Sequence, residues 1–443
     1  MNEAPDYLSK YGYLEEDVES EASYGAMATL SVMRGVADLS ELEEPVFKGQ
    51  AKKLQRSIDV MTKAGQSWIQ DRKLDAVFIY NGRLDLTNAI LLAAQSLNVP
   101  VFSVERSWSG NGMQIVADGT PLQLHRHHEM VEHWSRYPLT TAQIERACSF
   151  VSGRLAQTSI GEFKQWNAGQ TTGLAAMYTG FWAYLPSSIF ERIGHPDWSS
   201  GWESDLRALE LLLSERTITR DRLVVRGHPQ WKQLTPVTQE KYRNWCKQHE
   251  VVYLESDSQV STQELISVSD GVIVNGSSTA LEAGMLGKRI LNLSPTFYEK
   301  GGFCINLKEP SDVIKFARSP AWIDSSDVVI RCLRAIYTIN YRYMQLTNSV
   351  TALNSYDYSF NSIDNKEYFE ELVLGRRIPP DDNTFANSDS AEKQFIESAR
   401  GDFYSYLNAR HTKTDIANKV KGSVEVLRSN KYALLDILDK LVR

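Results

Sequence analysis

Apolar residues recur along the first part of the chain in two alternating patterns, which predict a helix, a strand, a second helix and a second strand. Helical spacing runs over 46–70, and a short apolar run at 75–80 ends in turn residues. A second helical pattern covers 86–97 and is followed by a strand-like run at 99–104. Because the connections are short, this strand–helix–strand unit favours a parallel sheet.

The second half of the chain repeats the alternation more regularly, as expected of a doubly wound sheet. We expect strands over 183–186, 223–226, 251–255, 271–274 and 289–293, and helices over 203–214, 237–248, 263–268 and 278–286.

The remaining segments carry weaker patterns. Residues 1–45 are acidic and suggest short helices, 107–135 look irregular, and 168–175 have the Gly, Gln and Thr content of a linker. Further helices are expected over 139–155, 158–167, 391–409 and 413–442, with a polar break at 378–388.

These elements predict an α/β protein with two Rossmann-like domains facing a cleft and a helical C-terminal extension. We place the first domain at 1–172, the second at 173–322, and a helical segment that packs back on both at 323–443. The first domain lacks the strand and Gly-rich turn with which enzymes of two Rossmann-like domains usually begin. It is therefore either reduced and rearranged, or preceded by residues that this sequence does not include.

Composition narrows the function. The net charge of −7 argues against general nucleic-acid binding. The four cysteines form no C-x-x-C pair, which favours a reducing cytoplasm over a disulfide framework. No apolar run approaches the length of a membrane-spanning helix, and the acidic start lacks a signal-peptide core.

The most informative motif is the turn that follows the predicted strand at 271–274. Asn275, Ser277, Ser278 and Thr279 lie between this strand and the next helix, where backbone N–H groups and hydroxyls can hold a phosphate. Glu282, one helical turn further on, could accept hydrogen bonds from a ribose. Ser and Thr would equally serve as a plain helix cap, and Glu as a favourable first-turn residue.

A second turn follows the strand at 223–226. Arg226 offers a permanent charge, His228 a ring N–H, and Pro229 a rigid loop, all suited to a phosphate. The alternative is a solvated turn with an incidental histidine. A third turn after the strand at 183–186 places Ser187 and Ser188 at the predicted cleft, where they could bind phosphate or cap a helix.

In the first half, polar residues follow both strands of the strand–helix–strand unit. Asn81, Arg83 and Arg106 are candidates for binding an acceptor, and Glu105 or Asp85 could act as a general base on its hydroxyl. A buried ion pair between Arg83 and Glu105 is the competing interpretation.

A histidine-rich run, His125-Arg126-His127-His128 with His133, suggests a metal site at first sight. The spacing fits no standard zinc set and no cysteine lies nearby, so we predict no metal. A basic rim for an anionic acceptor is the interpretation that we favour.

The turns at 226–229 and 275–283 are similar to the His-Pro and Ser-Ser/Thr motifs of bacterial glycosyltransferases with the GT-B fold. They most resemble the capsule polysaccharide biosynthesis proteins, including the Kdo transferases, and also look like bacterial sialyltransferases and teichoic acid glycerophosphotransferases. The resemblance covers roughly 75–110 and 180–295. The acidic catalytic motif of the sialyltransferases is not found here, and the segment beyond about 345 has no match.

The resemblance implies a metal-independent glycosyltransferase without a cofactor. It implies a CMP-linked, Kdo-like donor held by His228 and by Ser277 to Thr279, with Glu282 on the ribose. The acceptor would be an oligosaccharide or lipid-linked glycan in surface polysaccharide synthesis, and the protein would be cytoplasmic, at most peripheral to the inner membrane. A CDP-glycerol-type glycerophosphotransferase and a non-catalytic glycan-binding scaffold are the alternatives.

Overall fold

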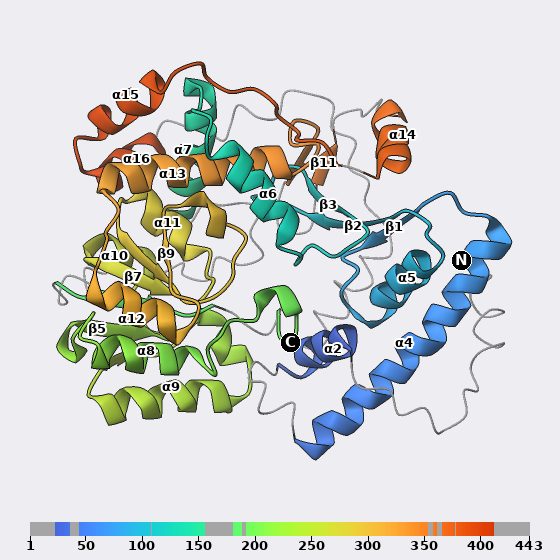
Figure 1. The fold of residues 1–443 in the computed structure, drawn as a ribbon, viewed down its shortest axis with the longest axis horizontal. Coiled ribbons are helices and arrows are strands. Elements are labelled where there is room, and N and C mark those ends of the chain that lie inside the picture. Colours follow the sequence, from blue (N-terminus) through green and yellow to red (C-terminus); the bar gives the residue numbers. More distant parts are fainter. Residues whose placement is uncertain are drawn as a thin grey trace.

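The computed structural model describes residues 23–35, 44–107, 109–155, 180–187, 192–352, 358–360, 366–376 and 378–411. The predicted α/β class is confirmed: two sheets are flanked by helices, and all the strands predicted from the sequence are present (Figure 1). No helix in these ranges is both long enough and apolar enough to span a bilayer.

The second half is built on a six-stranded parallel sheet. Its order is β6-β5-β4-β7-β8-β9, which in chain order is the 3-2-1-4-5-6 arrangement of dinucleotide-binding folds. The order reverses between β4 and β7, so the carboxyl ends of these two strands flank the topological switch point. The strands are β4 (Trp182–Leu185), β5 (Leu223–Arg226), β6 (Val252–Leu254), β7 (Gly271–Val274), β8 (Arg289–Asn292) and β9 (Ile305–Asn306).

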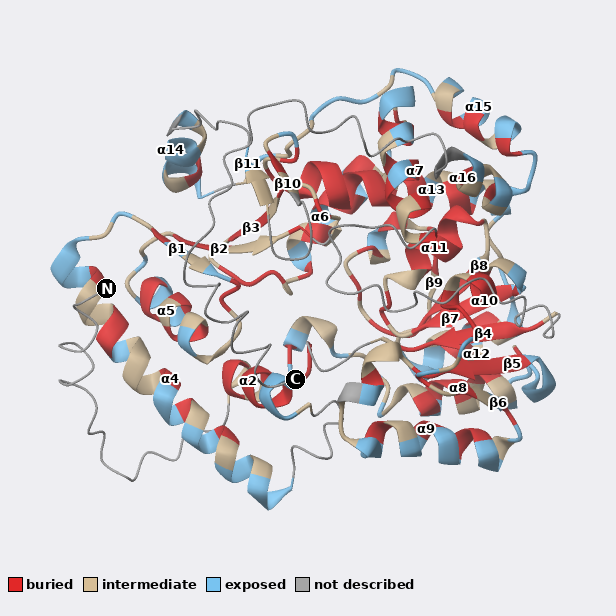
Figure 2. Ribbon diagram, turned by 180° about the vertical axis from the view of Figure 1, so that it is seen from behind, coloured by how far each residue is buried: buried red, intermediate tan, exposed pale blue. Residues whose placement is uncertain are grey.

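Helices cover both faces of this sheet, which is why its central strands are buried throughout (Figure 2). On β4, Trp182 and Tyr184 point to one core, whereas Ala183 and Leu185 point to the other. The first core is closed by α8 (Asp205–Ser214), α9 (Pro236–His249) and α12 (Pro310–Arg318). The second is closed by α10 (Thr262–Val268), α11 (Thr279–Met285) and α13 (Ser325–Tyr337).

Side-chain caps explain where several of these helices begin. The Ser204 hydroxyl accepts the Arg207 N–H at the start of α8. Glu309 and Asp312 form a reciprocal capping box on α12, and Asp324 accepts the Ser326 N–H before α13. Each cap satisfies a backbone donor that the helix itself leaves unpaired.

The sheet of the first half is smaller in the part of the chain that the structure describes. β1 and β2 are parallel and joined by α5, as predicted, and β3 runs antiparallel to β2. The long helix α4 packs along α5 and also contacts α2. The elements are α2 (Tyr24–Arg34), α4 (Pro45–Arg72), β1 (Val77–Tyr80), α5 (Asp85–Ser96), β2 (Val101–Arg106) and β3 (Met113–Ala117).

The prediction that 107–135 is irregular was wrong, because this range contains β3 and α6 (His125–Trp134). Glycines with positive φ at 110 and 112 precede β3 and make its surroundings resemble a loop. Helix α6 begins with charged and histidine residues, so its short apolar face is hard to recognise in the sequence. Met130, Val131 and Trp134 on this face are buried.

Helix α7 (Thr141–Leu155) shares its core with the second half, although the sequence analysis placed it in the first domain. Ile144, Ala147 and Val151 belong to the same apolar cluster as Ala280 and Leu333, and α7 lies beside α11 and α13 (Figure 1). The predicted boundary at 172–173 and the predicted helix at 158–167 lie outside the described residues.

The C-terminal segment returns to both halves. Phe395 and Leu407 enter the core that contains α7, and Leu372 packs against Phe102 and Ile115 of the first sheet. The predicted helix at 391–409 is two helices, broken where Arg400 and Gly401 adopt positive φ. The elements after α13 are a π-helix (Thr338–Tyr343), β10 (Val350–Ala352), β11 (Tyr358–Phe360), α14 (Lys366–Gly375), α15 (Ser390–Ala399) and α16 (Phe403–His411). Residues 413–442 lie outside the described residues.

Candidate functional site

The turns after β4, β5 and β7 lie at one edge of the six-stranded sheet. Both β5 and β7 pair with β4 in the parallel direction, so the carboxyl ends of all three strands meet there. Ser187 follows β4, the middle strand of the three. His228 and Ser277 follow its two neighbours, so only β4 separates their turns. Ser188 lies outside the described residues.

The turn after β7 is compact and internally bonded. Gly276 has a φ of 68°, and a Cβ there would lie 2.3 Å from an Arg192 guanidinium nitrogen. The Ser277 hydroxyl accepts hydrogen bonds from the Thr279 N–H at 3.4 Å and from the Thr279 hydroxyl at 2.9 Å. The positive φ and the close approach of the arginine both favour glycine at this position.

Two guanidinium groups contact this turn from elements far away in the sequence. Arg154, near the end of α7, donates to the Ser278 hydroxyl at 3.2 Å. Arg192, from the connection after β4, donates to the Asn275 carbonyl at 2.6 Å. The sequence analysis missed both residues, because no local pattern relates them to the turn. Together they bring two guanidinium groups to the switch point.

Glu282 forms a buried ion pair that the sequence analysis did not predict. Its side chain is almost fully buried, and one carboxylate oxygen lies 3.0 Å from the Arg154 Nε atom. Glu282 thus holds the Arg154 guanidinium beside Ser278, and its predicted contact with a ribose stays a prediction.

His228 is held as a neutral hydrogen-bond donor. Its Nδ1 atom accepts the Gln230 N–H at 3.2 Å, so the ring proton resides on Nε2. Burial, assisted by the nearby Arg226 charge, lowers the pKa of His228 to about 3. Pro229 begins the short 3-10 helix that fixes this geometry. Among the described residues Nε2 has no hydrogen-bond partner, so it remains able to donate to a ligand.

The Arg226 guanidinium is turned into the protein. It donates to the carbonyls of Gly227 at 2.8 Å, Val260 at 3.2 Å and Ser258 at 3.4 Å. Its side chain is buried, and burial lowers its pKa to about 10. These bonds tie the His228 turn to the loop at 258–260, while a direct contact between Arg226 and a phosphate stays a prediction.

The Asn275 side chain joins a buried cluster that the sequence analysis did not anticipate. One Asp205 carboxylate oxygen accepts hydrogen bonds from the hydroxyls of Tyr184 and Tyr242 and, at 3.4 Å, from the Asn275 amide. Burial and the Asp205 charge raise the pKa of both tyrosines well above the usual value. The cluster fixes the start of the turn after β7 against α8 and α9.

The first-half candidates gather at the ends of β1 and β2. Asn81 has a φ of 64°, and its side-chain oxygen accepts the Arg83 N–H at 3.1 Å, so Asn81 shapes the turn. Asp85 begins α5. Burial and then the Glu105 charge raise the pKa of Tyr80, while Arg106 and Arg83 lower it. Glu105, Arg106 and Arg83 thus lie near enough to Tyr80 to affect its pKa, and the identity of a general base stays a prediction.

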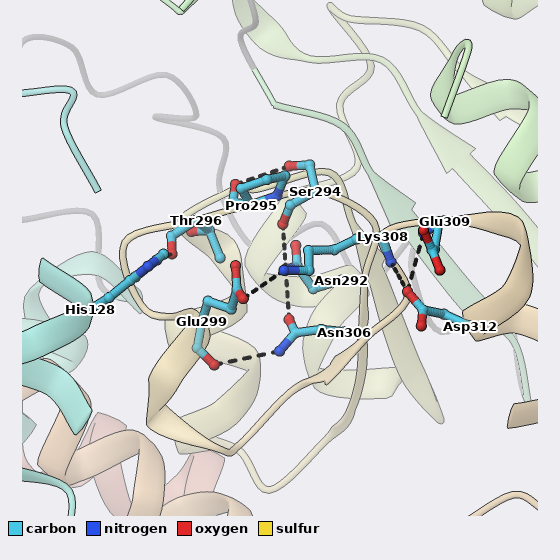
Figure 3. A network of polar contacts seen from close by, with 10 residues as sticks. All are labelled: His128, Asn292, Ser294, Pro295, Thr296, Glu299, Asn306, Lys308, Glu309 and Asp312. Carbon is cyan, nitrogen blue, oxygen red and sulfur yellow. Dashed lines mark hydrogen bonds and ion pairs between the residues drawn. The ribbon is translucent and has the colours of Figure 1, made fainter. Parts of the chain in front are cut away.

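The histidine-rich run anchors α6 to its neighbours, and its role as a basic rim for an anionic acceptor stays a prediction. His128 Nε2 lies 2.8 Å from the Thr296 carbonyl in the loop after β8 (Figure 3). His127 is buried and stacks on Tyr343 at 3.8 Å, and Arg126 donates to the Ile378 carbonyl at 2.7 Å. Over the described ranges, no three His, Cys, Asp or Glu side chains are grouped so as to hold a metal ion.

The loop that receives His128 is itself held by a polar network. The Asn292 amide donates to the Ser294 carbonyl at 2.7 Å and to the Asn306 side chain at 2.9 Å, and Asn306 donates to the Glu299 carbonyl at 3.4 Å (Figure 3). Ser294 also accepts from Arg192 at 3.5 Å. The network thereby connects the end of β8 with the arginine at the switch point.

No family model matches the chain, and no curated protein matches it. Among solved structures, it is similar to the KpsC β-Kdo 2,7 transferase of Thermosulfurimonas dismutans, with a TM-score of 0.37 and 14% identity over 71% of this chain and 90% of that one. The β-Kdo 2,4 transferase of the same organism has a TM-score of 0.36 and 16% identity, over 61% and 80%. A UDP-GlcNAc 2-epimerase of Methanocaldococcus jannaschii, in complex with UDP-GlcNAc and UDP, has a TM-score of 0.31 and 13% identity, over 61% and 77%.

Kdo transferases are thus among the structures that this chain is similar to. At this level of similarity the likeness identifies no activity, and the site must be interpreted from its own residues.

Proposed function

We propose that this protein is a glycosyltransferase that moves a sugar from a nucleotide donor to a glycan acceptor in bacterial surface polysaccharide synthesis. The observation that carries the proposal is the turn at 275–278. It lies at the switch point of a Rossmann-ordered sheet and is contacted by the guanidinium groups of Arg154 and Arg192. A turn at a switch point with guanidinium groups beside it suits the phosphate of a nucleotide.

In this proposal the donor phosphate lies between the turns after β5 and β7. His228 donates its Nε2 proton, Arg154 offers guanidinium N–H groups, and the hydroxyls of Ser277, Ser278 and Thr279 provide further hydrogen bonds. Negative charge accumulates on the phosphate as the glycosidic bond breaks, and donors already in position stabilise it without reorganisation. By the motif resemblance, the donor is CMP-linked and its sugar is acidic and Kdo-like.

The acceptor glycan is assigned to the ends of β1 and β2. Asn81, Arg83 and Arg106 would bind it, and Glu105 or Asp85 would accept the proton of the attacking hydroxyl. Ser187 and Ser188 would line the donor side. We propose that no metal or other cofactor takes part, because the arginines and His228 stabilise the phosphate charge. The protein would act in the cytoplasm, peripheral to the inner membrane, on an oligosaccharide or lipid-linked glycan.

Thermal denaturation with CMP, UDP, GDP and dTDP tests the proposal. A nucleotide at saturating concentration should stabilise the folded protein by on the order of a few kcal/mol. His228→Asn should remove much of this stabilisation and lower transfer by about 100-fold. Asn can still accept the Gln230 N–H, so the turn is kept while the Nε2 donor is lost.

The matched control is His249→Asn on α9. Within the described part of the chain, the contacts of this ring are to its own helix, at the Trp245 carbonyl (3.0 Å) and the Trp245 ring. This variant should behave like the wild type. Absence of stabilisation by all four nucleotides would overturn the proposed function, as would a His228→Asn variant with undiminished transfer.

A further inference from the structure

The sequence Gly-His-Pro-x-Trp occurs twice in this chain, at 194–198 and at 227–231. The second copy contains His228. The first contains His195 and lies in the connection that follows β4, one strand away from the other copy. Nothing assigned so far to the site uses His195.

The two copies adopt the same conformation. Each histidine precedes a 3-10 helix that begins with proline, with φ and ψ of −77° and 125° at His195 and of −67° and 133° at His228. In each, Nδ1 accepts the backbone N–H two residues later at 3.2 Å. The ring proton of His195 therefore resides on Nε2, as it does in His228.

His195 lies in an enclosed environment. The residue is more than nine-tenths buried, and its ring meets the Tyr24 ring edge-on with centroids 4.7 Å apart. Burial lowers its pKa, although Asp197 opposes this effect. No hydrogen-bond partner of its Nε2 atom is found in the described part of the chain. An Nε2 donor that the described residues leave unpaired is open to a ligand, as it is in His228.

The surroundings place His195 at the switch point, on the side of the first half. Arg192, three residues earlier, donates to the Asn275 carbonyl in the turn after β7. Trp198, three residues later, donates to the Leu122 carbonyl at 2.8 Å, and Asp197 accepts the Leu124 N–H at 2.9 Å. The His195 turn thus bridges the phosphate-binding edge and the loop before α6.

We propose that His195 is a second phosphate-binding residue, which donates its Nε2 proton to an anionic oxygen of the same nucleotide phosphate that His228 binds. The inference rests on the proposed function and adds a residue to its site. Two copies of one turn, each with a neutral donor, would hold the phosphate from the connections after β4 and β5. A cap alone would explain the Nδ1 contact, whereas phosphate binding also explains why the same turn occurs twice at this edge of the sheet.

His195→Asn is the decisive variant, because it separates the two roles. Its side-chain oxygen can accept the Asp197 N–H and keep the turn, whereas the Nε2 donor is lost. We expect an unchanged melting temperature without ligand and a decrease in kcat/KM of about 10- to 100-fold. The extra stabilisation given by the best nucleotide of the panel over its nucleoside should also decrease, since this difference reports on the phosphate.

His249→Asn again serves as the control and should keep both values. If the wild type shows the nucleotide-specific stabilisation and His195→Asn retains it together with full kcat/KM, the assignment of His195 is overturned while the proposed function stands. If the wild type shows no such stabilisation, the proposed function itself fails. If His195→Asn does not fold, His195→Gln takes its place, because it puts an amide N–H near the Nε2 position. This variant should then retain part of the phosphate-specific difference, and its complete loss would overturn the assignment.

Discussion

His127 and His228 stay neutral far below the pH at which histidine is ordinarily half protonated. Burial lowers the pKa of each ring to about 3. His127 stacks on Tyr343 inside the protein, whereas His228 caps the short helix in the turn after β5. For binding, the consequence is that His228 does not become charged at any pH at which the protein would be assayed. For stability, the consequence is a loss of folding free energy as the pH falls, because only the unfolded chain takes up these protons.

Between pH 6.5 and about 3, the unfolded chain takes up protons at these histidines and the folded protein does not. Stability is therefore fully present above pH 6.5 and decreases as the pH falls, by about 1.4 kcal/mol per pH unit for each histidine. His127→Phe keeps a ring against Tyr343 but removes one titrating group. Its melting temperature should decrease less steeply than that of the wild type between pH 6.5 and 4.5. Parallel slopes in the two proteins would contradict this explanation.

At the scale of elements, α11 shows how a short helix carries the turn after β7. It has only seven residues, too few for independent stability, and Ala280 to Met285 are all buried. Its neighbour α13 comes so close that a Cβ added at Gly284 would lie 2.5 Å from the Cys332 sulfur. Packing against α13, and not intrinsic propensity, therefore sets the position of α11 and of Ser278 at its start.

Gly284→Ala should destabilise the protein by about 1–3 kcal/mol, because it overpacks the contact between α11 and α13. The matched control is Gly49→Ala in α4, where an added Cβ meets nothing within 4 Å. That substitution should raise stability by roughly 0.5–1 kcal/mol through helix propensity. Melting temperatures of both variants test the argument. Adding Cys332→Ala to Gly284→Ala should recover part of the loss, and no recovery would locate the strain elsewhere.

At the scale of the whole molecule, α15 joins segments that are distant in the sequence. Glu392 is completely buried and receives two hydrogen bonds from Arg334 of α13, at 2.9 and 2.6 Å. It also accepts the Leu139 N–H at 2.9 Å, just before α7. One carboxylate therefore holds the C-terminal segment, α13 and the start of α7 together, and α7 is the helix that presents Arg154 to the site.

Glu392→Ala should cost about 3–5 kcal/mol, because it leaves the Arg334 charge buried without its partner. The adjacent Lys393→Ala breaks an exposed pair with Asp389 at 3.0 Å and should cost less than about 1 kcal/mol. Nucleotide binding should also weaken in Glu392→Ala if α7 shifts. Equal melting temperatures in the two variants would show that the buried pair does not hold these segments.

The strands of the second half were predictable because the sequence pattern that marks each of them spans only a few neighbouring residues. The buried parallel strands are continuous apolar runs, so β5 and β7 were predicted with the bounds that the structure shows. The first half was harder to interpret: β3 becomes recognisable only through its pairing with β2, and the apolar face of α6 is short and begins among charged residues.

The sequence by itself determined the alternation of strands and helices and the positions of the turns with His228 and Ser277, because apolar periodicity and turn residues act over a few neighbouring positions. Only the tertiary structure decided which charges reach those turns. Arg154 and Arg192 come from distant elements, Arg226 turns into a loop, and Glu282 pairs with an arginine. Side-chain partners of this kind depend on how helices pack across a sheet, and no local pattern in the chain encodes that packing.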